Sequence, residues 1–395
     1  MVESLDWITP ATFEEVLKRN KTDEIIVLDV SLKLLPKSYT CKLYRVYVKY
    51  KINLEKEVIT SSFIIKRKHE HITFAADFGM IQKELFIYKY GLPKLEAVIG
   101  EKLGPSTYLL NDDLMILQDL CSDNFHNSAA CGIQLDYNHC KEVIKRIAKF
   151  HAASVVVYEQ EPRLVNKFGE EVFYKKELHG KFHSVVEDAL QVLAEEISTW
   201  PESKQFTQAI VNMKNEIWQL LTRYSNCFGK VCVLNHGDLS SNNILFKYDP
   251  INVVDIRFID FQCCRYTTPV MDLQFFLCTS VDINVIQDHL SDILDLYLNT
   301  FNGTLLEQSN QNILVKSDFE LEFNNADFVG LYAASICLPQ FLANEEEIEC
   351  LKGVNFDEFK NSCKNPIFKL MKSPKYRVVM PKILEYFYNR QLFTV

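Results

Sequence analysis

The sequence predicts an α+β protein with a strand-rich first part and a mainly helical second part. Residues 42–66 are rich in β-branched and aromatic side chains, whereas helical periods dominate from residue 137 onward. The chain has 395 residues, of which 48% are hydrophobic, and so exceeds the size at which one core usually keeps growing. We therefore expect two units, residues 1–118 and residues 119–395.

The first part is expected to form an antiparallel sheet followed by one helix. Partial alternation of apolar and polar residues from Lys42 to Lys66 is typical of strands that have one face toward water. Asp77–Tyr90 carries apolar residues at helical spacing, and we expect Gly91 and Pro93 to end this helix.

Two more short strands are expected before the helical part begins. They are Tyr108–Leu110 and Leu114–Leu117, which flank an Asn-Asp-Asp turn. After them, apolar residues recur at helical spacing over residues 143–155, Val185–Trp200 and Phe206–Tyr224. This second part is therefore expected to be mostly α-helical.

Polar clusters follow two short strand-like runs within the helical part. Lys230–Leu234 precedes the segment His236–Asn243, which reads HGDLSSNN, and Val253–Phe261 contains the Asp of an Ile-Asp-Phe-Gln segment. Side chains that perform chemistry are expected at these two strand ends.

The two clusters together contain the residue types that phosphoryl transfer requires. A carboxylate must orient the attacking hydroxyl and accept its proton, and Mg²⁺ must be held by oxygen ligands near the phosphates. We assign Asp238 as the catalytic base, Asn243 as a metal ligand through its amide oxygen, and Asp260 as the main Mg²⁺ ligand. Each segment alone is also typical of an ordinary polar turn, but the combined pattern of HGD, an Asn five residues after the Asp, and IDF after a strand favours the kinase interpretation.

The chain resembles the insect ecdysteroid kinase-like (CHK kinase-like) family, within the aminoglycoside and choline phosphotransferase group. The resemblance covers most of the chain, and its motifs are HGDLSSNNILF, FIDFQ, KLYRVYVKY, FIIK, KELFIYKYGLP, LQDL, AKFHAAS and PVMDLQFFLCTS. It implies a protein kinase-like bilobal fold, with residues 1–118 as the nucleotide-binding lobe and residues 119–395 as the helical lobe that carries the phosphotransfer loop and the acceptor pocket. It also implies that ATP and Mg²⁺ are the cofactors.

The resemblance further implies that Lys66 pairs with the nucleotide phosphates and with Glu84 on the following helix. A lysine and a glutamate are also common as separate surface charges. Lys68 competes with Lys66, because residues two apart on a strand face the same way. We favour Lys66 because it ends an apolar run.

The resemblance also places the adenine edge at a hinge formed by the backbone of Gln118, Asp119 and Leu120. Relatives commonly have Gly in the phosphate-covering turn, but residues 35–41 of this chain have none, so we expect Ser38 or Thr40 to contact phosphate there.

Other features of the catalytic loop and its surroundings are assigned from the same pattern. Gln118 and Ser240 stand where relatives often carry Glu and Trp, and Ser240 is expected to alter the acceptor pocket. Asp272 resembles a structural Asp behind the catalytic loop, and His151 on an apolar helical face is expected to be packed and hydrogen-bonded.

Composition and targeting signals limit the partners and the location. The formal charge is -9 without a long basic run, so no nucleic-acid partner is expected. Met1–Lys18 lacks the features of a secretory signal, and the 16-residue uncharged stretch Phe328–Ala343 is read as a buried helix because it is too short for a membrane span. Twelve irregularly spaced cysteines in a chain of this length fit a reducing compartment, and we expect a cytoplasmic monomer.

Three functions remain open at this point. The first is an ATP:alcohol phosphotransferase that acts on an ecdysteroid or another hydroxylated, largely apolar metabolite or xenobiotic. The second is a catalytically inactive pseudokinase that acts as a binding protein, which the Gly-poor phosphate turn favours. The third is a protein kinase, but the HRD, DFG and APE segments are not matched. Zinc enzymes and Ser-His-Asp hydrolases are disfavoured, because neither HExxH, CxxC nor GxSxG is present.

Overall fold

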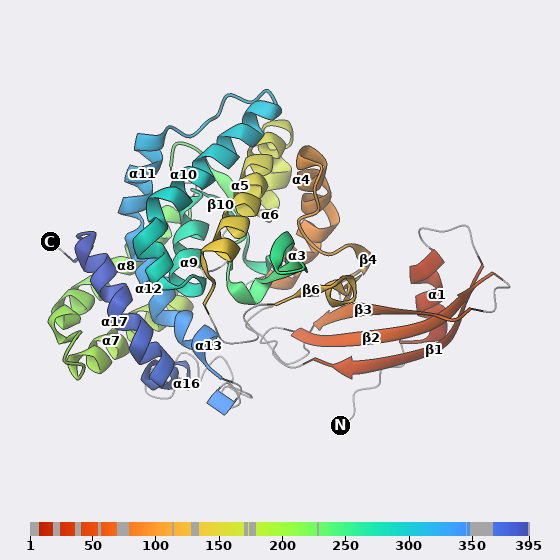
Figure 1. The fold of residues 1–395 in the computed structure, drawn as a ribbon, viewed down its shortest axis with the longest axis horizontal. Coiled ribbons are helices and arrows are strands. Elements are labelled where there is room, and N and C mark those ends of the chain that lie inside the picture. The colour runs from red at the N-terminus through yellow and green to blue at the C-terminus, as the bar shows by residue number, and fades with distance from the viewer. Residues whose placement is uncertain are drawn as a thin grey trace.

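A computed structural model confirms the α+β class, with an antiparallel sheet at one end of the molecule and a mainly helical remainder (Figure 1). The structure describes residues 8–18, 24–35, 41–53, 57–68, 79–112, 114–127, 134–169, 173, 179–226, 229–344, 346–347 and 366–393.

The N-terminal sheet has five antiparallel strands in the order β1-β2-β3-β5-β4. The strands are β1 Ile25–Leu34, β2 Cys41–Ile52, β3 Ile59–Lys68, β4 Thr107–Leu110 and β5 Leu114–Gln118. β2 and β3 confirm the sheet predicted over Lys42–Lys66, and β4 and β5 confirm the two short strands.

The two faces of this sheet have different environments. One face packs against helix α1 (Pro10–Lys18), where Phe13 joins Val46, Val48 and Phe63 in a core of their own. Successive side chains of a strand point to opposite faces of the sheet. Lys66, three residues after Phe63 in β3, therefore points to the opposite face. The register therefore turns Lys66 toward the helical part of the molecule.

The helix predicted over Asp77–Tyr90 continues past Gly91 and Pro93, so the expected stop is wrong. Gly91 has a helical φ of -75°, and Pro93 lies in the first turn of the next helix, where its missing N–H costs no hydrogen bond. The helix ends instead at Gly100, whose φ is +67°. The segments are α3 Met80–Phe86, the π-helical turn η1 Ile87–Gly91 and α4 Leu92–Ile99, and residues 77 and 78 lie outside the described part.

The helical part is built around α5 (Tyr137–Gln160), which packs against α10 (Ile283–Glu307) and α4. The predicted helices at Val185–Trp200 and Phe206–Tyr224 are confirmed as α7 and α8. These two helices span α7 His179–Ser198 and α8 Thr207–Tyr224. The further helices of this part are α6 Pro162–Phe168, α9 Val270–Ser280, α11 Lys316–Asn325, α12 Asp327–Ile336, α13 Leu338–Leu342, α16 Pro366–Lys369 and α17 Pro374–Asn389. Short 3-10 turns are η2 Leu120–Asp123, η5 Lys204–Phe206, η6 Ser241–Asn243, η7 Phe261–Cys263 and η8 Leu370–Lys372.

Phe328–Ala343 is not one buried helix but two, α12 and α13, which are separated at Cys337. Pro339 explains the break, because it lacks an N–H and is tolerated in the first turn of a new helix rather than inside a continuous one. None of the described helices is both long and apolar enough to cross a membrane.

Two small sheets lie among these helices and lead into the predicted polar clusters. They pair β7 (Val233–Asn235) with β10 (Arg265–Thr267), and β8 (Ile244–Asp249) with β9 (Asn252–Phe258) and β6 (Phe125–His126). The HGD segment follows β7, and Asp260 follows β9, so both polar clusters begin at a strand end as predicted. The division into residues 1–118 and 119–395 stays a prediction, since α4 shares the large helical core.

Candidate active site

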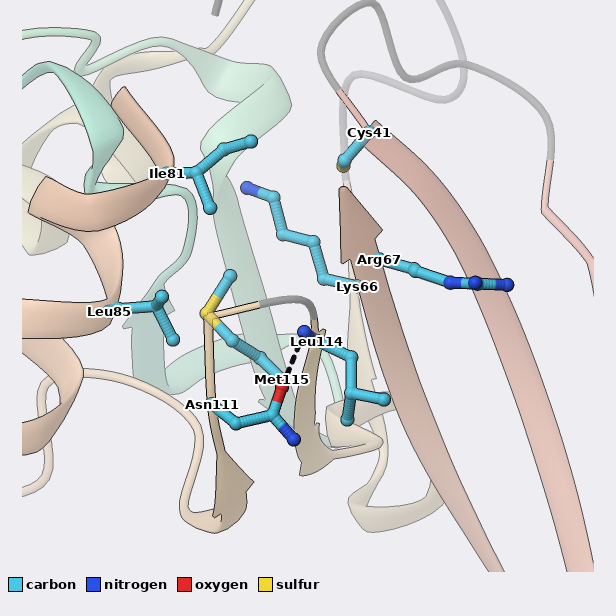
Figure 2. Close-up of a pocket in the computed structure, with 8 residues that line it drawn as sticks. All are labelled: Cys41, Lys66, Arg67, Ile81, Leu85, Asn111, Leu114 and Met115. Carbon is cyan, nitrogen blue, oxygen red and sulfur yellow. Dashed lines mark hydrogen bonds between the residues drawn. The ribbon is translucent and has the colours of Figure 1, made fainter. Parts of the chain in front are cut away.

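Lys66 joins the N-terminal sheet to two acidic side chains from other elements. Its Nζ lies 2.6 Å from Glu84 Oε2 on α3 and 2.6 Å from Asp260 Oδ1 after β9. Figure 2 shows Lys66 pointing from β3 toward α3, whereas Arg67 points away from that helix. The cavity beside Lys66 measures about 10 Å³, so α3 is packed closely against the lysine. The side chain of Lys68, the alternative lysine, lies outside the described part.

The three charges of this cluster are strongly coupled because the site is buried. Lys66 is 7% exposed and Glu84 is 1% exposed. Burial lowers the pKa of Lys66, but Asp260 and Glu84 outweigh burial and raise this pKa well above its ordinary value. Burial raises the pKa of Glu84, and the charge of Lys66 opposes this shift. Lys66 is therefore a fixed cation between two carboxyl groups.

The HGD loop is held in a narrow backbone path that requires Gly237. This residue has a φ of +82°, and a Cβ at this position would lie 1.9 Å from the backbone oxygen of Cys263. Glycine has no Cβ and tolerates a positive φ, so it permits this tight backbone path into the loop. The loop that carries Asp238 is thus packed directly on the segment that follows Asp260.

Gly237→Ala is expected to lower both stability and any activity. The close approach and the positive φ together predict a loss of about 2–3 kcal/mol in unfolding free energy, and a displacement of Asp238 by about 1 Å is expected to cost about 100-fold in rate. Urea denaturation and initial rates measure the two effects. The control is Gly303→Ala on α10, where the added Cβ meets no atom within 4 Å. Unchanged stability in Gly237→Ala would contradict the packing argument.

Asp238 and Asn243 are connected within the catalytic loop. Asn243 Nδ2 donates hydrogen bonds to the backbone oxygen and to Oδ2 of Asp238, both at 2.9 Å. This use of the amide nitrogen turns the amide oxygen of Asn243 away from Asp238. Burial and the nearby charge of Asp260 raise the pKa of Asp238 to about 7. A carboxyl group poised near neutral pH is suited to proton transfer.

Asp260 occupies the left-handed backbone region, with a φ of +66°. Aspartate tolerates this region better than most residues. Its Oδ1 faces Lys66, and its Oδ2 accepts a hydrogen bond from Gln262 Nε2 at 3.2 Å. The side chain remains 28% exposed, so Asp260 can still reach a ligand.

His236 links the two loops as a neutral hydrogen-bonding residue. Its Nε2 lies 3.0 Å from the backbone oxygen of Ile259, which can only accept, so Nε2 carries the proton. Nδ1 then accepts from the backbone N–H of Asp238 at 3.3 Å. Burial lowers the pKa of His236. The neutral imidazole therefore ties the backbone of Asp238 to the backbone of Ile259, the residue before Asp260.

Asp272 supports the catalytic loop from behind, as expected. Its carboxylate accepts from the backbone N–H groups of His236 at 2.6 Å and Gly237 at 2.9 Å. His151 Nε2 lies 3.2 Å from the same carboxylate, and His151 Nδ1 lies 2.9 Å from Tyr297 OH. The expectation of a packed and hydrogen-bonded His151 is confirmed.

The segment predicted as a hinge follows β5, and its polar side chains are already engaged. Asp119 accepts hydrogen bonds from Arg45 Nη2 at 3.2 Å and from Ser62 Oγ at 2.9 Å. Gln118 Oε1 accepts from the backbone N–H of Ser106 at 3.0 Å. These two polar side chains are therefore held in place by the protein itself.

The remaining predicted residues give less information. Leu120, the last residue of the predicted hinge, is buried, and Ser38 and Thr40 lie outside the described residues. Ser240 is buried within the loop His236–Asn243.

A family model described as the ecdysteroid kinase-like family matches residues 37–309, which is more than half of the chain. The chain belongs to the ecdysteroid kinase-like family. No curated protein matches its sequence. Membership of this family supports the general activity of a small-molecule phosphotransferase.

Solved structures resemble this ecdysteroid kinase-like protein loosely. A choline/ethanolamine kinase family protein from Mesorhizobium loti has 11% identity and a TM-score of 0.39, covering 90% of this chain and 92% of that chain. A variant of aminoglycoside 2′-phosphotransferase IIIa in complex with GDP has 10% identity and a TM-score of 0.47, covering 96% and 98%. An aminoglycoside phosphotransferase of the 2″ type in complex with GDP and kanamycin has 10% identity and a TM-score of 0.43, covering 98% and 99%. The family assignment rests on the sequence match.

Several side chains of the ecdysteroid kinase-like site were not found from the sequence. Lys83 Nζ donates to the backbone oxygen of Cys264 at 2.7 Å and ties α3 to the segment after Asp260. Arg265 Nη2 donates to the backbone oxygen of Gly237 at 3.2 Å. The one available signal was the position of Lys83 beside Glu84. Arg45 and Ser62 had no signal, since their partner lies far along the chain.

Proposed function

We propose that this ecdysteroid kinase-like protein transfers the γ-phosphoryl group of ATP to a hydroxyl group of an ecdysteroid or another hydroxylated, largely apolar small molecule. The observation that carries the proposal is the position of Lys66 Nζ, 2.6 Å from both Glu84 and Asp260. This contact joins the sheet, α3 and the loop beside Asp238 into one charged site.

Lys66 is proposed to bind the nucleotide phosphates while Glu84 fixes its direction. A lysine held by a glutamate on the following helix places ATP in the kinase-type mechanism. The backbone of Gln118, Asp119 and Leu120 is proposed to meet the adenine edge. The low exposure of Lys66 and Glu84 supports a fixed binding geometry.

The oxygen groups near Asp238 fit Mg²⁺. This ion is usually bound through one or two carboxylates together with substrate phosphates and water, rather than by a full protein cage. Within the described ranges, no group of three or more His, Cys, Asp or Glu side chains is arranged to hold a metal. Asp260 and the amide oxygen of Asn243 would hold the ion. When bound, Mg²⁺ would neutralise negative charge on the phosphates.

Asp238 is proposed to orient the acceptor hydroxyl and to accept its proton. The hydrogen bonds from Asn243 hold the carboxylate, and its pKa of about 7 places its proton uptake near neutral pH.

The acceptor class comes from the family rather than from the geometry. Val185–Trp200 and Phe328–Ala343 are proposed to contribute acceptor-pocket residues, and Ser240 is proposed to shape the pocket. The expected cytoplasmic location and monomeric state stay predictions.

Calorimetric titration of Mg-ATP into the purified protein separates a kinase from a pseudokinase that does not use nucleotide. We expect Mg-ATP binding that weakens on replacing Asp260 with asparagine. Asp249→Asn is the matched control, because it removes an exposed carboxylate at the end of β8. Absence of Mg-ATP binding in the unmodified protein would contradict the proposal. It would favour the alternative, a catalytically inactive pseudokinase that acts as a binding protein.

The raised pKa of Asp238 predicts a pH dependence of kcat/KM for Mg-ATP, which reports groups of the free enzyme. Asp238 must be ionised to accept a proton, so kcat/KM is expected to rise about tenfold per pH unit below its pKa of about 7 and then level off. A flat profile of kcat/KM between about pH 5 and 8 would contradict this role.

The same shift predicts the effect of pH on stability. The pKa of Asp238 is raised from 3.8 to about 7 in the folded protein, so the folded state binds this proton more tightly than the unfolded state. The resulting stabilisation is fully present below pH 3.8 and is lost as the pH rises through about 7. Comparison of urea denaturation for the unmodified protein and Asp238→Asn isolates this contribution, and identical pH profiles of the two would contradict it.

A further inference from the structure

An ion pair connects the hinge segment to the second strand of the sheet. Arg45 Nε lies 2.7 Å from Asp119 Oδ2, and Arg45 Nη2 donates to Asp119 Oδ1 at 3.2 Å. The Asp119 carboxylate also accepts from Ser62 Oγ and from the backbone N–H of Cys121. Both oxygens of Asp119 are thus engaged by the protein, which leaves its side chain unsuited to reading a base.

The strand register places Arg45 on the same face of the sheet as Lys66. Lys66 is opposite Leu43 in the pairing of β2 with β3, and Ile64 is opposite Arg45. Residues two apart on one strand share a face, so Arg45 lies on the same face as Leu43, the residue opposite Lys66. Its Cα lies about 7 Å farther along the strand than that of Leu43. The displacement runs toward the hinge, because Ile64 is opposite Leu117 on β5. Arg45 therefore stands between the proposed phosphate-binding lysine and the hinge, where the base of a bound nucleotide would lie.

The guanidinium group of Arg45 is anchored by one edge. The Nε and Nη2 edge faces the Asp119 carboxylate, and the side chain is 25% exposed while that of Asp119 is only 3% exposed. In the described ranges, no aromatic ring covers this guanidinium. A planar cation held at its edge can stack a broad face on an aromatic ligand.

We propose that Arg45 stacks on the purine base of the bound nucleotide and forms the roof of the base-binding part of the site, with Asp119 as the positioning residue. This inference rests on the proposed function, because it assigns a base contact to the nucleotide site. The base is then held by stacking on a fixed cation and by backbone groups of the hinge, while Lys66 acts on the phosphates.

Stacking on the base predicts an effect that depends on the presence of the base. Loss of a stacking side chain weakens binding by about five- to 100-fold. Mg-ATP affinity is therefore expected to fall by this factor in Arg45→Ala and in Arg45→Lys, since lysine keeps the charge but lacks the planar group. Affinity for Mg-tripolyphosphate, which has the phosphates without the base, is expected to remain within about twofold of the unmodified protein.

The measurement is calorimetric titration of the full chain with Mg-ATP and with Mg-tripolyphosphate. Lys49→Ala is the matched control, because it removes another cation from the same face of β2, one that lies 3.9 Å from Asp29. Thermal denaturation accompanies each variant, and Arg45→Lys carries the test if Arg45→Ala does not fold.

Three results would overturn the inference. Unchanged Mg-ATP affinity in both Arg45 variants would exclude a base contact, and equal losses for Mg-ATP and Mg-tripolyphosphate would assign Arg45 to the phosphates. Failure of the unmodified protein to bind either probe would overturn the proposed function as well, and so is distinct from the first two results.

Discussion

Asp238→Asn is expected to lower kcat by about 10²–10⁴-fold, because asparagine keeps the size of aspartate but cannot accept the proton of the acceptor hydroxyl. The buried hydrogen bonds from Asn243 and the surrounding packing hold the loop, so Mg-ATP affinity is expected to change by less than about threefold. Initial rates at saturating substrate, together with calorimetry, separate the two quantities.

The matched control for this prediction is Asp249→Asn, an exposed carboxylate at the end of β8 that should leave kcat unchanged. A kcat within about fivefold of the unmodified protein in Asp238→Asn would show that another group accepts the proton. A parallel collapse of Mg-ATP binding would instead show that the substitution disrupts the nucleotide site.

Lys66→Met is expected to lower the free energy of unfolding by about 3–5 kcal/mol and to remove detectable phosphoryl transfer. Removal of one partner of a buried ion pair leaves its opposite charge without compensation, and here Glu84 and Asp260 both lose their cation. Transfer is lost because no other side chain is proposed to fix the phosphates. Urea denaturation and a product assay measure the two effects.

A double variant separates stability from chemistry at this cluster. Lys66→Met combined with Glu84→Gln removes the unpaired buried carboxylate on α3, so part of the lost stability is expected to return while transfer stays absent. Lys49→Met is the control, since this exposed lysine lies 3.9 Å from Asp29 and such pairs contribute less than about 1 kcal/mol. Full stability and activity in Lys66→Met would contradict the assigned role of the cluster.

The sequence predicted the strand ends that precede the two polar clusters, because this geometry is local. HGD and the following Asn lie within eight residues of one another, and a strand end before each polar cluster can be recognised from β-branched residues. Gly237 was also accessible to sequence reasoning, because a glycine between a strand and a catalytic loop indicates an unusual backbone path. Sequence reasoning therefore succeeded where neighbouring residues determine the geometry.

Sequence reasoning failed where tertiary contacts decide the outcome. Gly91 and Pro93 are normally signals for the end of a helix, but Gly91 packs against Phe168 and the helical path continues into α4. The pair Arg45 and Asp119 is separated by 74 residues, and its formation depends on strand register, which the sequence does not reveal. Lys66 and Lys68 face the same way on one strand, so the sequence separated them only by the apolar run that ends at Lys66.

The most direct test of the central claim is transfer of a labelled phosphoryl group to a small-molecule hydroxyl. The purified protein is incubated with Mg²⁺, γ-¹⁸O-labelled ATP and a panel of ecdysteroids and plant secondary alcohols, and the products are read by mass spectrometry beside Asp238→Asn. We predict a phosphorylated alcohol that carries the label in the unmodified protein and is absent from the variant. No labelled product from any alcohol, together with no Mg-ATP binding, would contradict the account and favour a catalytically inactive binding protein.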